Sequence, residues 1–168
     1  MKLKQLIIPM VAAIALLPSC SGDNSNDPQI DAKDTTSVKP STTSPILTKV
    51  TAAPDWEAQA SAIPEKSFMP YGGETITMGV PASVANVTQN DIAAVFVGDQ
   101  CRKAVHPNDK GVFHLIVSKL QTEEDSSIKF HVRYYSAQKG GYYTSADMDM
   151  VSGQILGNDS IPYYVTWK

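Results

Sequence analysis

Hydrophobic and polar residues alternate along several short segments in the C-terminal two-thirds of the chain. The most regular alternation is at residues 128–135, where one face carries Ile128, Phe130, Val132 and Tyr134 and the other carries Lys129, His131, Arg133 and Tyr135. A period of two predicts a β-strand with one buried and one solvent-exposed face. Earlier in the chain, residues 92–97 form an apolar run, Gly98-Asp99 interrupt it, and residues 100–105 resume an extended pattern. This arrangement predicts a β-hairpin, around which the other strands pack.

Further segments with strand-like composition predict the rest of an all-β domain. They are residues 74–80, 112–120, 142–145, 148–151 and 161–166, with turn formers or charges between them. Residues 112–120 are apolar on both predicted faces, which is typical of a central strand. Trp56 and residues 58–63 predict an irregular edge segment. About seven short strands separated by turns predict an immunoglobulin-like antiparallel β-sandwich over residues 55–168.

Residues 1–19 have the pattern of a lipoprotein signal peptide. Lys2 and Lys4 form a positively charged start, and the apolar core at residues 6–17 is too short to span a membrane. The sequence LPSC, which ends at Cys20, resembles the bacterial lipobox. The resemblance implies a diacylglyceryl group on the Cys20 thiol and a further acyl chain, such as palmitate, on the amine that cleavage exposes. Several acyl chains give firm membrane anchoring. The alternative is an ordinary signal peptide with a chance cysteine.

The residues after the cysteine resemble the polar, acidic signal that sends lipoproteins of the Bacteroidetes to the outer face of the outer membrane. The residues that carry this resemblance are Ser21, Asp23 and Asp27. It implies a lipid-anchored protein that faces the cell exterior. Residues 20–54 are rich in Ser, Thr, Pro, Lys and Asp and predict a flexible tether, because they hold too little apolar surface to offset the entropy of ordering. The exceptions, which could form a short strand or docking segment, are Ile46, Leu47 and Val50.

Charge and cysteine content narrow the function classes. The formal net charge is −3, and loss of Lys2 and Lys4 with the signal peptide makes it −5. A mildly acidic chain is a poor candidate for nucleic-acid binding, which needs clustered basic residues. The two cysteines are Cys20 and Cys101, so lipidation of Cys20 leaves Cys101 without an intrachain partner. We expect Cys101 to be a small buried hydrophobic residue, the alternative being a nucleophile activated by His106.

Candidate catalytic and metal-ligating residues are few. The three histidines do not have metal-ligand spacing, and no Cys or acidic cluster completes a set; they are His106, His114 and His131. Alternate acids at Asp147 and Asp149 could bind calcium, but a solvated face is the simpler interpretation. The acids of residues 123–125 could form a glycosidase pair, but solvated charges in a polar turn are by far the simpler interpretation. The sequence therefore predicts no cofactor, no metal and no enzyme activity.

Aromatic residues are the one feature that suggests a binding surface. Tyrosines occur as pairs, and on a strand one member of each pair faces outward. Exposed members could form a flat surface for sugars or a protein partner. The candidate residues are Trp56, Tyr135, Tyr143, Tyr163 and Trp167. Ordinary packing in the core of the sandwich is the alternative.

The hairpin segment also carries a family resemblance. Residues 93–104, AAVFVGDQCRKA, resemble a domain of secreted and surface proteins of the Bacteroidetes whose segment is of the type AAFVGDECRG-A. The resemblance extends over residues 56–167, with Gln100 in place of the common acid and Lys103 in place of the common glycine. It implies a β-sandwich module with no established catalytic site, found both as an appended module and in small lipoproteins.

Together these features predict a non-enzymatic, surface-exposed outer-membrane lipoprotein. By analogy of architecture, we expect an accessory subunit of a SusC/SusD-type, TonB-dependent nutrient uptake complex. The alternative is a stand-alone carbohydrate-binding lipoprotein that uses the tyrosine and tryptophan surface. An exposed aromatic platform with polar neighbours favours a glycan ligand, whereas a larger apolar surface favours a protein or peptide partner.

Overall fold

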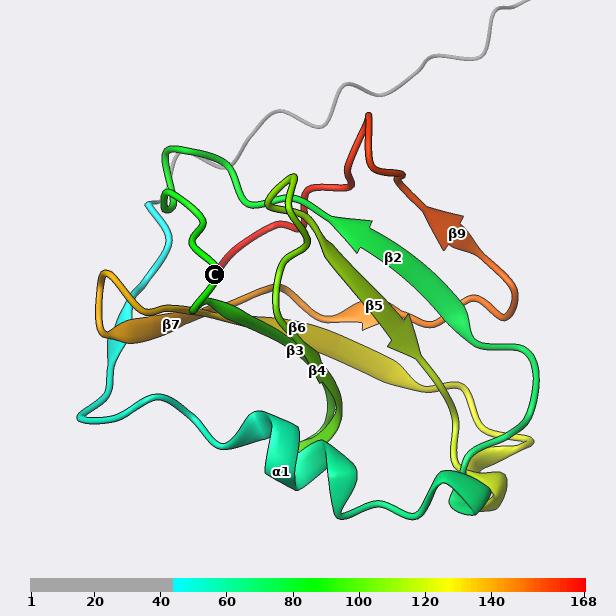
Figure 1. The fold of residues 1–168 in the computed structure, drawn as a ribbon. Coiled ribbons are helices and arrows are strands. Elements are labelled where there is room, and N and C mark those ends of the chain that lie inside the picture. The colour runs from blue at the N-terminus through cyan, green and yellow to red at the C-terminus, as the bar shows by residue number, and fades with distance from the viewer. Residues whose placement is uncertain (1–43) are drawn as a thin grey trace, which may run out of the picture. The chain divides into compact units, whose positions relative to one another are not determined.

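Two β-sheets packed face to face make up the part of the chain that the computed structural model describes, residues 44–168 (Figure 1). The strands are β1 (Thr48–Lys49), β2 (Glu74–Met78), β3 (Ile92–Val97), β4 (Gln100–Val105), β5 (Phe113–Val117), β6 (Lys129–Ser136), β7 (Gly141–Thr144), β8 (Met148–Asp149) and β9 (Ile155–Leu156). The helical segments are α1 (Trp56–Ser61) and the 3-10 turns η1 (Glu65–Ser67) and η2 (Gln121–Glu123). The first sheet has the order β1-β7-β6-β3-β4, with β8 also paired to β6, and the second has the order β5-β2-β9.

The strand order confirms the prediction of an all-β, immunoglobulin-like sandwich. Strand β2 pairs with β5 in one sheet, and β3 pairs with β6 in the other, and the chain crosses between the sheets after β1, β2, β4, β5 and β8. This exchange of neighbours is the Greek-key order of immunoglobulin-like folds. Every pairing between strands is antiparallel except that of β2 with β9. Three of the strands have only two residues.

The predicted hairpin is present with the predicted bounds. Strands β3 and β4 are joined by a two-residue turn at Gly98-Asp99, and Gly98 has a φ of 57°, which a glycine adopts without strain. Strand β3 has an apolar run because both faces of the first sheet are covered. One face packs against the second sheet, and the other packs against Trp56 of α1, which lies on the far side of the sheet (Figure 1).

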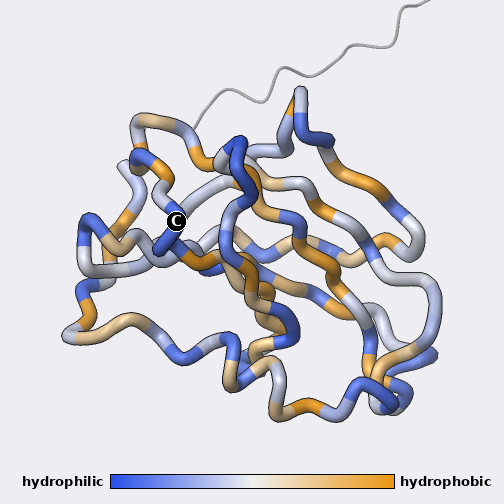
Figure 2. The backbone as a smooth tube through the Cα atoms, in the orientation of Figure 1, coloured by the Kyte–Doolittle hydropathy of each residue, from blue (hydrophilic) through white to orange (hydrophobic). Residues whose placement is uncertain are grey.

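The main core lies between the two sheets. It is built from Ile76, Met78, Phe113, Leu115 and Val117 of the second sheet and from Ala93, Val95, Phe130, Val132, Tyr134 and Tyr143 of the first. A smaller core lies under α1 and contains Trp56, Ile92, Ala94, Phe96, Cys101 and Tyr135. Hydrophobic residues accordingly follow the strands of both layers, while the η2 turn is hydrophilic (Figure 2).

A buried carboxylate joins three parts of the fold. Asp91, immediately before β3, is fully buried, and its two oxygens accept four hydrogen bonds. The donors are the Thr88 amide at 3.0 Å, the Thr88 hydroxyl at 2.9 Å, the Tyr134 hydroxyl at 2.5 Å and the Ala137 amide at 2.9 Å. The backbone carbonyl of Asp91 also lies 2.9 Å from Nδ1 of His106. Asp91 therefore fixes the loop before β3 to the C-terminal end of β6 and to the residue that follows β4.

The described part of the chain begins before the predicted domain boundary. The prediction placed residues 20–54 in the tether, but β1 pairs with β7, and the Ile46 amide donates to the Lys168 carbonyl at 2.8 Å. The expected short strand at the end of the tether is thus present and belongs to the sandwich. A Cβ atom at Gly141 would lie 2.6 Å from the Thr48 carbonyl oxygen, so β1 packs this closely only because residue 141 is glycine.

Three predictions about individual strands are wrong. Strand β5 is an edge strand rather than a central one, and His114 and Ile116 on it are exposed. Residues 161–166 form no strand, only an isolated bridge between Met78 and Tyr163. The second face of β6, expected to be solvated, is covered by α1 and buries Tyr135. In addition, the irregular edge segment predicted at residues 58–63 is the end of a helix, and β9 was not predicted.

The predicted signal peptide, residues 1–19, lies outside the described residues, as does the first part of the predicted tether. Among residues 44–168, no helix is long and apolar enough to cross a membrane.

Replacement of Asp91 by alanine tests its role as the common acceptor. Asp91→Ala leaves buried donors from Thr88, Tyr134 and Ala137 without an acceptor, and we expect the free energy of unfolding to fall by about 3 kcal/mol. Asp99→Ala is the matched control, because the Asp99 side chain is fully exposed. Its ion pair with Arg133 is long, at 3.9 Å. We expect this control to change stability by less than about 0.5 kcal/mol. Urea unfolding followed by circular dichroism measures both, and equal effects of the two variants would contradict the assignment.

Candidate functional site

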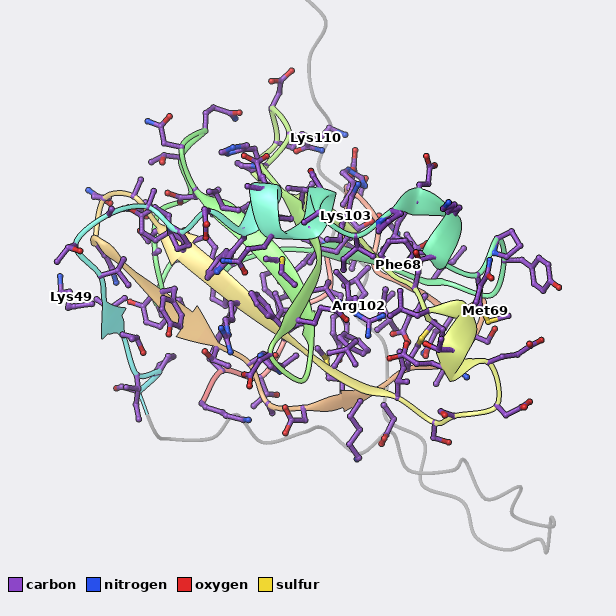
Figure 3. All side chains as sticks on the ribbon, turned by 90° about the horizontal axis from the view of Figure 1, so that it is seen from below. Lys49, Phe68, Met69, Arg102, Lys103 and Lys110 are labelled. Atoms are coloured by element: carbon purple, nitrogen blue, oxygen red, sulfur yellow. The ribbon has the colours of Figure 1, made fainter. Side chains whose placement is uncertain are left out.

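An open groove of about 1200 Å³ lies between the segment α1–η1 and strands β4 and β5. We call residues 56–70, which cross from one sheet to the other, the arm. The arm and the two strands line the groove with both apolar and charged side chains, including Ile63, Phe68, Met69, Arg102, Lys103 and Ile116. Figure 3 shows Phe68, Met69, Arg102 and Lys103 together in this region, beside α1 and η1.

Both ends of the arm are fixed to the sandwich. At its start, the Trp56 ring packs edge-on against Phe96 at 5.6 Å and against Tyr142 at 5.7 Å. At its end, the Met69 amide donates to the Lys119 carbonyl at 2.9 Å. Between these points no backbone hydrogen bond joins the arm to β4 or β5 in the described part of the chain. The arm therefore lies across the edges of β4 and β5 without forming backbone hydrogen bonds to either strand.

Arg102, which lines the groove, forms an ion pair with Glu123. The register of β3 with β4 shifts so that Lys103 lies opposite Val95 and Cys101 lies opposite Phe96, which leaves Arg102 as the extra residue of a β-bulge. The bulge turns the Arg102 side chain inward, where its nitrogens bind the two Glu123 oxygens at 2.7 and 3.1 Å.

Burial and charge make this pair strong. The Arg102 and Glu123 side chains are 3% and 22% exposed. The hydrogen bonds from Arg102 hold the pKa of the Glu123 carboxyl below its ordinary value. The Leu120 amide also donates to Glu123 at 2.8 Å. Both oxygens of Glu123 are therefore bound by Arg102, whereas its neighbours Glu124 and Asp125 are exposed. Residues 123–125 thus do not form a catalytic acid pair.

The five aromatic residues that were predicted to form an exposed binding surface do not form one. Trp56, Tyr135 and Tyr143 are only 4%, 7% and 4% exposed, because α1 covers one face of the first sheet and the second sheet covers the other. Tyr163 and Trp167 are half-buried against the main core. The expectation that these five residues share an exposed platform is therefore wrong, and core packing was the correct alternative.

Cys101 is buried, as the sequence predicts. Its thiol donates to the Trp56 carbonyl at 3.4 Å, and burial raises the pKa of the thiol to about 11. A nucleophilic cysteine needs a lowered pKa and a neighbouring base. His106, the base considered for it, instead contacts the Asp91 carbonyl and lies 3.4 Å from Glu57.

The other candidate ligands are dispersed. His114 lies 3.0 Å from Asp159, whereas His131 is stacked on Phe96 and 3.6 Å from Asp147. Burial, and next the charge of Arg133, lowers the pKa of His131. Asp149 pairs with Lys129 at 2.9 Å, separately from Asp147. Within residues 44–168, no group of three or more His, Cys, Asp or Glu side chains is arranged to hold a metal ion.

The structure also shows two features that the sequence analysis missed. An apolar row crosses the outer face of the second sheet, where Ile155 and Ile116 lie on either side of Thr75 and are 73% and 49% exposed. Glu74 is a buried carboxylate that accepts a hydrogen bond from the Val151 amide at 2.7 Å, and burial raises its pKa. Neither feature has a signal in the local sequence, because each depends on the position of β9 and of the loop before it.

Comparisons of the chain with protein-family models, with curated proteins and with solved structures found no match. The predicted lipidation residue, Cys20, and the predicted export-signal residues Ser21, Asp23 and Asp27 lie outside the described residues.

Removal of the acid from the buried ion pair should destabilise the protein in a pH-dependent way. Glu123→Gln leaves the Arg102 charge buried and unpaired, so we expect a loss of about 2 kcal/mol at pH 6. The pKa of Glu123 is lower in the folded state than in the unfolded state, where it is about 4.3. Its contribution to stability is therefore complete above that pH and is lost as the pH falls through the folded value.

The matched control for this variant is Glu124→Gln, because Glu124 is the exposed neighbour. We expect it to have almost no effect at any pH. Urea unfolding between pH 3 and pH 6 measures both variants. A loss for Glu123→Gln that does not shrink toward pH 3 would contradict the account of the pair.

The Cys101 thiol should be unreactive in the folded protein. With Cys20→Ser, Cys101 is the only thiol in the chain. We expect negligible reaction with Ellman's reagent up to pH 9, because the thiol is buried and protonated up to a pH of about 11. The same sample in denaturant should react fully. Fast labelling of the native protein would show that the smaller core opens readily.

Proposed function

We propose that the chain is a non-enzymatic lipoprotein of the outer membrane that faces the cell exterior and contacts a protein partner through the groove. The partner we propose is a SusC/SusD-type, TonB-dependent uptake complex, of which this chain is an accessory subunit. The membrane anchor is the acylated Cys20, with Ser21, Asp23 and Asp27 as the export signal, as the sequence predicts.

The observation that carries the proposal is the open groove with apolar side chains on both walls. Ile63, Phe68 and Met69 line it from the arm, and Ile116 lines it from β5. Protein interfaces combine such apolar contacts with a polar rim, here supplied by residues such as Lys103. A glycan site would instead be favoured by an exposed aromatic platform, and the aromatic residues considered for it are used in the cores. A protein or peptide partner is therefore preferred to a stand-alone carbohydrate-binding role.

The length of chain between the proposed anchor and the sandwich is sufficient for the groove to reach a neighbouring membrane protein. About 24 residues separate Cys20 from Ser44, the first described residue. A chain of that length spans at most roughly 80 Å when fully extended. The sandwich can therefore contact parts of a partner that project well beyond the lipid surface.

The test is extraction of the tagged, lipidated chain from outer membranes in mild detergent, followed by quantitative mass spectrometry. We expect stoichiometric recovery of a TonB-dependent barrel and its lid lipoprotein. Ile63→Glu, which places a charge in the groove, should abolish the recovery. The control Tyr164→Glu changes an exposed aromatic residue that does not line the groove. Unfolding midpoints should show that both variants fold.

Two results would contradict the proposal. Recovery of the lipoprotein alone would exclude a stable complex with an uptake system. Equal recovery of the barrel with wild type and Ile63→Glu would place the contact outside the groove.

A further inference from the structure

Strand β5 has a hydrogen-bonded neighbour on one side only. It begins the order β5-β2-β9 of the second sheet, and β4 ends the order of the first sheet. Both strands therefore have an outer edge without a strand partner among residues 44–168. The groove lies along these edges, since Lys103 of β4 and Ile116 of β5 both line it. An unpaired strand edge presents a row of amide and carbonyl groups to which another extended chain can bind.

The neighbouring hydrogen bonds show which β5 residues face this edge. The Lys119 carbonyl accepts from the segment that leads into β2, so it points toward β2. The Val112 carbonyl accepts from the Asn108 amide at 2.9 Å, on the side away from β2. Backbone groups alternate in direction along an antiparallel strand. The amides and carbonyls of His114 and Ile116 therefore point to the open edge, and no hydrogen bond joins them to the rest of the described chain.

The edge of β4 is less suited to pairing than the edge of β5. The bulge at Arg102 interrupts the regular spacing of backbone groups in β4, and α1 packs against that strand. Bulges and covering segments are devices that protect sheet edges. Strand β5 has no bulge, because its five residues keep one register with β2 and alternate regularly between buried and exposed side chains.

We propose that the groove accepts an extended peptide segment of a protein partner, which adds to the outer edge of β5 as an antiparallel or parallel strand. The inference rests on the proposed function and specifies how the partner is recognised. Backbone groups of His114 and Ile116 provide the hydrogen bonds, and side chains of the arm provide pockets for alternate residues of the peptide. Strand addition of this kind gains affinity from the main chain and specificity from the pockets.

The lining of the groove indicates the chemistry of the peptide. Its charged groups nearly balance: Glu57 and Glu65 oppose Lys66 and Lys103, and Arg102 is neutralised by Glu123. A strongly charged peptide therefore gains little, whereas aliphatic side chains at alternate positions can contact Ile63, Phe68 and Met69.

The experiment uses the full lipidated chain in detergent and a phage-displayed library of random dodecapeptides. The most enriched peptide is synthesised, and its affinity is measured by fluorescence anisotropy. We expect aliphatic residues at alternate positions of the peptide. Hydrogen exchange measured by NMR should show that the bound peptide protects the amides of His114 and Ile116.

Two substitutions at one position separate backbone pairing from side-chain contact. Ile116→Pro removes an outward-facing amide and leaves the hydrogen bonds to β2 intact, since proline is tolerated at strand edges. We expect it to weaken binding by at least about tenfold. Ile116→Ala keeps the amide and should weaken binding by less than about threefold. The exchange measurement on the wild-type chain decides the question if Ile116→Pro does not fold.

Several results would overturn the inference. These are enrichment of no peptide, equal affinity of wild type and Ile116→Pro, or protection of amides outside β5. Protection of the β5 amides in a peptide-free dimer would assign the edge to a second copy. The proposed function fails separately: recovery of the lipoprotein alone from membranes, with peptide binding at β5 intact, would exclude the uptake complex but keep the peptide site.

Discussion

The buried carboxylate of Asp91 is the contact on which the arrangement of strands depends. Its two oxygens accept hydrogen bonds from the loop before β3, from the Tyr134 hydroxyl near the end of β6 and from the backbone that follows β6. These contacts fix β3 against β6, and β3 in turn carries β4 through a two-residue turn. The position of the β4 edge, and with it one wall of the groove, follows from this chain of contacts. A buried carboxylate can do this only because each oxygen is fully hydrogen-bonded.

The first sheet is covered on both faces, and this decides where the protein can bind a partner. Most of the aromatic side chains that would make a flat binding surface are used to pack the second sheet on one face and α1 on the other. The regions left open include the strand edges at β4 and β5, with the arm above them, and the outer face of the second sheet. Binding at a strand edge uses backbone groups, so it tolerates a wide choice of side chains around the groove. We therefore propose that the protein recognises a protein segment rather than a flat sugar ring.

Local sequence patterns correctly predicted the hairpin, which depends on neighbouring residues. They did not predict the features that form where segments distant in the sequence meet. The β3–β4 hairpin was predicted with its bounds because Gly98-Asp99 sets the turn and the apolar run sets the strand. The mixed face of β6, with Arg133 and Tyr135, was predicted to be solvated. It is covered by Trp56, which lies far away in the sequence. The groove likewise joins the arm to Ile116 of β5, and no sequence pattern connects them.

The central claim, that the groove contacts a protein partner at the cell surface, is most directly tested by photo-crosslinking in intact cells. A photoreactive phenylalanine analogue at Ser61, an exposed residue on the groove wall, reports contacts there, and the same analogue at Tyr164 reports contacts elsewhere on the sandwich. The account predicts that Ser61 crosslinks to the barrel or lid of one TonB-dependent uptake complex and that Tyr164 does not. Crosslinks from Tyr164 to that complex, or none from Ser61, would contradict it.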